Sequence, residues 1–197
     1  MNYLAHAYLS FNDSKILVGN MISDFVKGKK KFDYPSRIQI GIELHRFIDS
    51  FTDAHAATKK AKIFFQPYVR LYSGAFVDVV YDHFLANDKN EFDEGALNLF
   101  SKTTYKMLDH NKEYFPEKFA QYFPYMQSQD WLYHYQFKQG IEKSMMGLVR
   151  RAKYLESSEK CYEIFLENYN ALNECYNLFF SDVKKNARDY LYKLLKP

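Results

Sequence analysis

Apolar residues recur along this chain at spacings of three and four, the pattern of helices with one buried face. Few breakers interrupt the pattern, because the 197 residues include only 7 Gly and 5 Pro. No stretch alternates apolar and polar residues strongly enough to indicate a strand. The sequence therefore predicts an all-α fold. The ranges expected to be helical are 15–28, 41–53, 68–87, 95–111, 140–154 and 157–195, the last as one helix or two. Residues 1–11 are expected to form a short helix or a buried arm, and a short basic helix that Pro67 ends or kinks should follow residue 53.

We expect a single domain, a multi-helix bundle over residues 1–197, because the chain shows no repeat and no linker. A chain of this length buries a substantial core. The unusual polar residues described below all fall within residues 1–85. Residues 86–197 are predicted to be supporting helices.

The charge balance argues against nucleic acid as a partner, because the net charge is only +3. Basic residues do cluster, in the ranges Lys27–Lys31, Lys59–Lys62 and Arg150–Lys153. Such clusters are either solvated surface or a docking surface for an acidic partner.

The cysteines and the N-terminal segment both indicate a soluble, cytoplasmic protein with no membrane association. Cys161 and Cys175 fall in one predicted helical stretch, about 21 Å apart in a straight helix, which is too far for a disulfide. We therefore expect free thiols and a reducing compartment. Residues 1–11 lack the basic start of a signal peptide, and no apolar stretch reaches transmembrane length.

The predicted helix Gly41–Asp53 carries its polar residues in one row. His45, Asp49 and Asp53 follow one another at i, i+4 and i+8 and cover about 80° of the helix surface, while the apolar positions lie on the other side. A row of imidazole and carboxylate groups is one way to bind a divalent cation, since both suit such ions. The alternative for one helix taken alone is a solvated polar face.

Three further segments carry ionisable groups in apolar surroundings. Asp24 lies among apolar neighbours, where a carboxylate is costly unless it is paired or bound to a metal; a backbone amide or Asn20 is the structural alternative. Asp82 and His83, with Asp78 one turn earlier, interrupt the apolar helix 68–87, and His6 lies in the apolar N-terminal segment.

Together these groups predict a metal site in the first half of the chain. We expect Asp24, His45, Asp82 and His83 to converge on one divalent cation, with Asp49 and Asp53 close by. Phosphate-binding glycine loops, a nucleophile elbow and cysteine-based metal motifs are absent from the sequence, which argues against nucleotide kinases, dehydrogenases and serine hydrolases.

Four blocks of sequence resemble one known enzyme family in their order and spacing. The blocks are MNYLAHAYLS, GNMISDFVKG, GIELHRFIDSFTD and DVVYDHFL. They are similar to acyl carrier protein phosphodiesterases, also called acyl carrier protein hydrolyases. The resemblance implies removal of the 4'-phosphopantetheine arm from holo-acyl carrier protein. It also implies a divalent metal, typically Mn²⁺ with Mg²⁺ or Fe²⁺ as alternatives, and a helical fold related to HD-type phosphohydrolases.

The resemblance, together with the residue chemistry, assigns roles to individual positions. Arg46 would hold a phosphate oxygen, and His6 would give a proton to the leaving serine oxygen. Because acyl carrier proteins are acidic, the loop with Lys29, Lys30 and Lys31 would steer docking. The expected catalytic residues are His6, Arg46, Asp49 and Asp53; the expected substrate-binding residues are Asn20, Lys29, Lys30 and Lys31; the expected metal ligands are Asp24, His45, Asp82 and His83.

Two other functions remain open at this stage. One is an HD-like phosphohydrolase that acts on a small nucleotide or another phosphodiester. The other is a helical module that binds an acidic protein without catalysis, but such a module has no need of carboxylates on apolar helices. The sequence indicates no oligomeric state.

Overall fold

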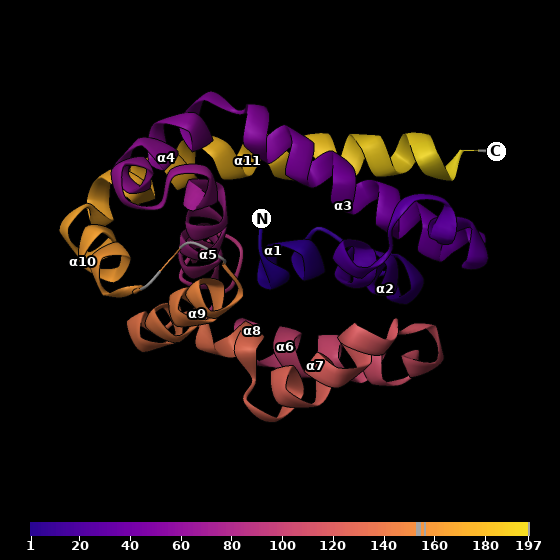
Figure 1. Cartoon of the computed structure of the whole chain (residues 1–197). Helices are drawn as coiled ribbons and strands as arrows, with labels where there is room; N and C mark the ends of the chain where they lie inside the picture. The colour runs from indigo at the N-terminus through magenta and orange to yellow at the C-terminus, as the bar shows by residue number, and fades with distance from the viewer. Residues whose placement is uncertain (153–154, 156, 197) are drawn as a thin grey trace.

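Helices joined by short turns make up the part of the chain that the computed structural model describes, residues 1–152, 155 and 157–196, and no strand occurs in it (Figure 1). The all-α prediction is confirmed. The helices are α1 (Tyr3–Tyr8), α2 (Ser14–Ile22), α3 (Ser36–Ala54), α4 (Ala56–Val69), α5 (Ser73–Ala86), α6 (Ala96–Asp109), α7 (Glu117–Ser128), α8 (Trp131–His134), α9 (Lys138–Arg151), α10 (Glu159–Glu167) and α11 (Tyr169–Leu195). The 3-10 turns are η1 (Ser23–Phe25), η2 (Gly28–Asp33), η3 (Arg70–Tyr72) and η4 (Lys112–Tyr114).

The two N-terminal helices lie in the middle of the molecule. In Figure 1, α1 and α2 lie between α3 with α11 on one side and α6, α7 and α8 on the other. Helix α2 packs along α3 and also contacts α6, while α1 contacts α2 and α5. Buried apolar residues run from Met1 to Leu191 and join these layers in one core. None of the described helices combines the length and hydropathy needed to cross a bilayer.

Helices α2 and α3 touch through their backbones. A Cβ placed on Gly19 would lie 2.1 Å from the Ile38 carbonyl oxygen, and one on Gly41 would lie 2.2 Å from the Ile16 carbonyl oxygen. Only glycine allows so close an approach at these two positions. As a result, side chains one turn further along α3 reach the backbone at the end of α2.

The helix predicted over 15–28 is shorter than expected. Helix α2 ends at Ile22, and Ser23–Phe25 forms the 3-10 turn η1. Ser and Asp are weak helix formers, and the Ser23 hydroxyl donates to the Ile42 carbonyl of α3 instead of remaining within a regular helix. Asp24 therefore lies on a turn beside α3 and not on an apolar helix.

Two other predicted helices are divided in the structure. The range 68–87 splits at η3, where Arg70 has a φ of 47°, and α5 begins at Ser73. The range 157–195, expected as one helix or two, forms the two helices α10 and α11, which meet at Asn168. The two cysteines lie on these two helices, and both are buried free thiols, as expected.

Candidate metal centre

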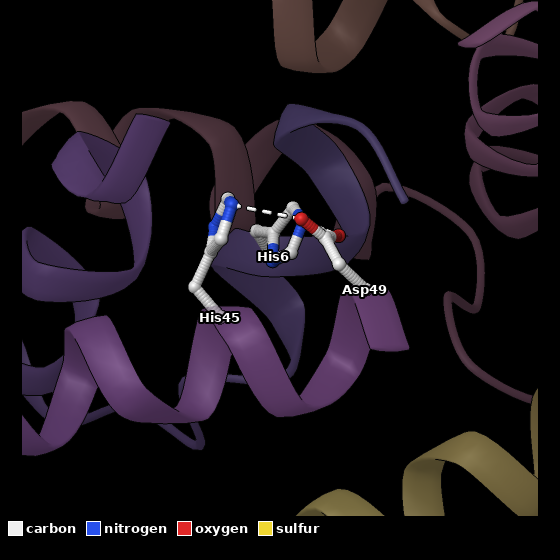
Figure 2. Close-up of side chains that lie close together, drawn as sticks. All are labelled: His6, His45 and Asp49. Carbon is white, nitrogen blue, oxygen red and sulfur yellow. Dashed lines mark hydrogen bonds and ion pairs between the residues drawn. The ribbon is translucent and has the colours of Figure 1, made fainter. Parts of the chain in front are cut away.

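Three side chains from two helices converge beside the α2–α3 crossing. His6 comes from α1, while His45 and Asp49 come from successive turns of α3 (Figure 2). One ligand atom from each lies within 4.8 Å of the other two. The imidazole rings stack with their centroids 3.9 Å apart and 16° between their planes. Among the described residues, this is the one group of three or more His, Cys, Asp or Glu with the spacing of a metal site.

The His45 ring is held with one nitrogen free. Its Nδ1–H donates to the backbone carbonyl of Asn20 at 2.7 Å. That carbonyl is available because α2 ends two residues later, and the last carbonyls of a helix have no partner within it. The buried Nε2 has no hydrogen-bond partner among the described residues, although it lies 3.1 Å from Asp49 Oδ2 and 3.4 Å from Asp24 Oδ1.

The His6 ring is oriented in the same way by the side chain of Asn20. Its Nδ1–H donates to Asn20 Oδ1 at 2.8 Å, and its Nε2 lies 3.1 Å from Asp49 Oδ1. The amide of Asn20 cannot flip, because its Nδ2 donates to the His6 carbonyl at 2.9 Å and to Ser10 Oγ at 3.1 Å. Asn20 thus orients both imidazoles, and both Nε2 atoms face carboxylate oxygens.

The electrostatics favour a positive charge between these groups. Burial and the neighbouring His45 lower the pKa of His6 to about 4, so this ring is neutral at neutral pH. Burial opposes protonation of His45, but the nearby carboxylates of Asp24 and Asp49 outweigh it and raise the pKa of His45 to about 9. The pKa of Asp49 lies well below its usual range despite burial, because both histidines face it. A lone pair on His45 Nε2 that faces two carboxylates requires either a proton or a cation.

Asp24 lies beside the three-residue cluster, with its Oδ1 3.4 Å from His45 Nε2. The sequence predicted a buried carboxylate, and this is wrong, because the Asp24 side chain is 73% exposed. The cause is the early end of α2, which places Asp24 on η1 above His45. The facing imidazole of His45, 3.4 Å away, lowers the pKa of Asp24. An exposed carboxylate beside a buried imidazole leaves the cluster open to solvent on this side.

Asp82 does not join the cluster, so its prediction as a metal ligand is wrong. It is fully buried on α5, and its carboxylate accepts the backbone N–H groups of Leu4 at 2.7 Å and Ala5 at 3.2 Å. These are among the free N–H groups of the first turn of α1. Burial raises the pKa of Asp82 to about 7, although the two N–H groups act in the opposite direction and lower it. Asp82 therefore fixes the helix that carries His6.

His83 points away from the cluster and was also predicted wrongly as a ligand. Its Nδ1–H donates to the Tyr135 carbonyl at 2.8 Å, and its Nε2 lies 3.0 Å from the Tyr169 hydroxyl. Both ring nitrogens are therefore occupied. The reason is geometric, because adjacent residues on a helix point about 100° apart, and only Asp82 faces α1.

The predicted catalytic residues divide between the cluster and the surface. Asp49 lies in the cluster, and so does His6, whose Nε2 makes it a candidate ligand and not a free proton donor. Arg46 lies beside the cluster, where its Nη2 donates to the Val26 carbonyl at 3.3 Å. Asp53 lies outside the cluster, because Lys62 holds it at 2.6 Å.

Of the predicted substrate-binding residues, one is buried beside the histidines and the others lie on η2. Asn20 is fully buried and hydrogen-bonded on every side, so it supports the histidines and cannot meet substrate. Lys29 and Lys30 are exposed on η2, whereas Lys31 forms an ion pair with Glu43 of α3.

Sequence reasoning missed the Asn20 carbonyl and Ser10 as supports of the two rings. The sequence signal for the Asn20 carbonyl was the pair Ser23 and Asp24, because these weak helix formers end α2 and leave that carbonyl without a helical partner.

The cluster fits a divalent cation. Two imidazole nitrogens with an oxygen from Asp49, and a further one from the exposed Asp24, form a mixed N/O set that suits Mn²⁺, Fe²⁺ and related ions. The unpartnered Nε2 of His45 is the atom that such an ion would satisfy.

Comparison with known proteins gives one family. Residues 1–183 match the family model described as "Acyl carrier protein phosphodiesterase". Proteins with this name include one from Klebsiella pneumoniae subsp. pneumoniae, 29% identical over 190 residues, which span 96% of this chain and 98% of that protein. Another from Yersinia pestis is 28% identical over 189 residues, 95% of this chain and 98% of that protein. No solved structure matches significantly, so the HD-like arrangement stays a prediction.

Proposed function

The chain belongs to the acyl carrier protein phosphodiesterase family, and on that premise we propose that it hydrolyses holo-acyl carrier protein. The bond cleaved is the phosphodiester between the 4'-phosphopantetheine arm and the carrier serine. The products are apo-acyl carrier protein and 4'-phosphopantetheine. A divalent cation, Mn²⁺ first among the candidates, is held by His6, His45 and Asp49 with Asp24.

One observation carries the proposal: both histidines turn an Nε2 toward the carboxylate of Asp49, and that of His45 has no hydrogen-bond partner. Both Nδ1–H groups are bound to Asn20. Second partners of this kind fix metal-binding histidines in their tautomer. A helical module that only binds an acidic protein has no use for such an arrangement.

The cation and the residues around it would divide the chemistry of hydrolysis between them. A divalent cation at this position offsets charge on the phosphoryl oxygens and lowers the pKa of water, which a phosphodiester requires for hydrolysis near neutral pH. Exposed Asp24 leaves the cluster accessible to a substrate as large as a protein. Arg46 donates to the Val26 carbonyl and also lies 3.7 Å from Glu43 Oε1, and the remaining N–H groups of its guanidinium are suited to bind a phosphate oxygen.

The experiment follows the mass of holo-acyl carrier protein on incubation with the protein and Mn²⁺, Mg²⁺ or Fe²⁺. We expect loss of the arm with Mn²⁺ and none with EDTA. His45→Ala and Asp49→Asn should lower the rate at least about 100-fold, because each removes a ligand of the cation that stabilises the transition state. His134→Ala is the matched control, since that histidine is exposed and bonds only to its own helix backbone.

Unchanged carrier-protein mass with all three metals would contradict the proposal. Hydrolysis of a small nucleotide diester under the same conditions would then place the protein among phosphohydrolases with another substrate. Full activity of His45→Ala would contradict the assigned site while leaving the reaction itself in place.

A further inference from the structure

A groove lies beside the metal cluster, between the C-terminal half of α4 and the start of α5. Its volume is about 880 Å³, and it runs along the side of the molecule where α3, α4 and α5 meet. None of the predicted site residues except Asp53 lines it. The proposed reaction uses no residue of α4, so the groove has no assigned role.

The groove continues from the cluster along α3. Asp49 belongs to the cluster, and Asp53, one turn or about 6 Å further on the same face, lines the groove. A second connection runs through the Met1 nitrogen, which lies 3.4 Å from Asp49 Oδ1 and 3.0 Å from Asp78 Oδ1. Asp78 is also part of the groove lining. The cluster and the groove are therefore linked by neighbouring turns of α3 and by the Met1 nitrogen.

The lining suits a neutral chain that carries amide groups. Lys62 is paired with Asp53, and Asp78 with the Met1 nitrogen, while Arg70 adds one positive charge to the lining. Gln66 and Ser73 add polar groups, and apolar side chains stand between them. At the mouth, Leu71 and Ile63 are exposed apolar side chains, at 99% and 63%.

We propose that this groove binds the pantetheine portion of the arm, an inference that rests on the proposed function. That portion has two amides, a hydroxyl and a geminal dimethyl group, and it has no charge of its own. Its amides match Gln66, Ser73 and the Lys62–Asp53 pair, and its methyl groups match the apolar lining. The arm runs from the cluster along Asp53 into the groove, and the carrier protein approaches from the opposite, Asp24 side.

Gly74 allows the groove to be filled without disturbing the core. A Cβ there would meet only the end of the Lys62 side chain, at 3.3 and 3.4 Å, and Asp53 Oδ1 at 3.8 Å. Gly74→Ala is therefore the matched control, and Gly74→Trp places a large ring in the groove. Gln66→Trp fills the groove from α4, from an exposed position where the fold does not depend on the side chain.

The probe is pantetheine without phosphate, titrated by NMR or calorimetry against the metal-loaded protein. We expect binding to wild type and Gly74→Ala, and at least tenfold weaker binding to Gly74→Trp and Gln66→Trp. With holo-acyl carrier protein as substrate, the two Trp variants should raise KM by a similar factor. Mn²⁺ affinity and the melting temperature, measured on the same samples, should stay at wild-type values and show that the cluster and fold are intact.

Failure of this inference is distinguishable from failure of the proposed function. If wild type removes the arm but pantetheine does not bind, or if both Trp variants keep the wild-type KM, the groove is not the arm site and the reaction stands. If wild type leaves holo-acyl carrier protein intact, the proposed function itself fails. A Trp variant that melts early is replaced by the other, since the two substitutions lie on different helices.

Discussion

Asn20 supports the two histidines with different parts of the residue. Its side chain holds His6 at 2.8 Å, and its backbone carbonyl holds His45 at 2.7 Å. Substitution of Asn20 therefore releases one ring and keeps the other. A substitution at Asn20 therefore tests the support of the His6 ring while both imidazoles stay in the protein.

We expect Asn20→Ala to weaken Mn²⁺ binding by about 10–100-fold, the usual effect of removing a hydrogen-bond partner of a metal-binding histidine. The affinity is measured from the electron paramagnetic resonance signal of free Mn²⁺. Asn20→Asp should not restore the affinity, because the oxygen that replaces Nδ2 would face the His6 carbonyl oxygen where a donor is needed. Asn87→Ala is the matched control, because Asn87 likewise bonds to backbone carbonyls, those of His83 and Gln136. Equal Mn²⁺ affinities of Asn20→Ala and Asn87→Ala would show that His6 needs no such support.

At the scale of the element, the crossing of α2 and α3 sets the site. The backbones meet at Gly19 and Gly41, and Asn20 follows the first glycine directly, while His45 lies one turn beyond the second. The hydrogen bond from His45 to the Asn20 carbonyl exists only at this close approach. The orientation of the His45 ring therefore depends on the close packing of α2 and α3 at the two glycines.

Gly41→Ala should destabilise the protein by about 1–3 kcal/mol or more, because the new methyl group meets backbone that can move only with the whole helix. Urea unfolding of the metal-free protein gives the free energy of unfolding. In the same variant, Mn²⁺ affinity should fall as α2 and α3 separate. Gly147→Ala, on α9 with no atom near the added Cβ, should instead stabilise by about 0.5–1 kcal/mol. A Gly41→Ala protein as stable as wild type would show that the helices can separate without cost.

Helix α5 shows where sequence reasoning succeeded and where it could not. Sparse glycine and proline with helical periodicity predicted the helices, because periodicity is local. The row on α3 was also visible, since that helix has one apolar face and one polar face. Helix α5 is buried nearly all round, so no face marks its direction, and the rotation that points Asp82 at α1 and His83 at Tyr135 depends on tertiary packing.

At the scale of the whole molecule, two sides of the cluster have different character. The groove lies on the Asp53 side, and the basic turn η2 follows η1 on the Asp24 side. Lys29 and Lys30 are exposed there, while Lys31 is tied to Glu43. An acidic carrier protein would therefore be attracted to one side while its arm occupies the other.

Replacing Lys29 and Lys30 together with Ala should lower kcat/KM toward holo-acyl carrier protein, most at low salt, and leave kcat nearly unchanged. The reason is that exposed charges at a rim act on the encounter rate and are screened by salt. Steady-state kinetics over a salt series provide the measurement. The matched control replaces Lys102 and Lys106, two exposed lysines on α6. If the two double variants behave alike at every salt concentration, η2 is ordinary solvated surface.

The hydrogen bonds around Asn20 also bear on how the chain assembles. They close loops of 14 residues to His6 and 25 residues to His45, whereas the contact of His55 with Asp182 of α11 closes a loop of 127 residues. Loop entropy grows with the logarithm of length, so the longest of these closures costs about 1.4 kcal/mol more than the 25-residue one. The groups that orient His6 and His45 thus come together at a lower entropic cost than the contact made by the long C-terminal helix.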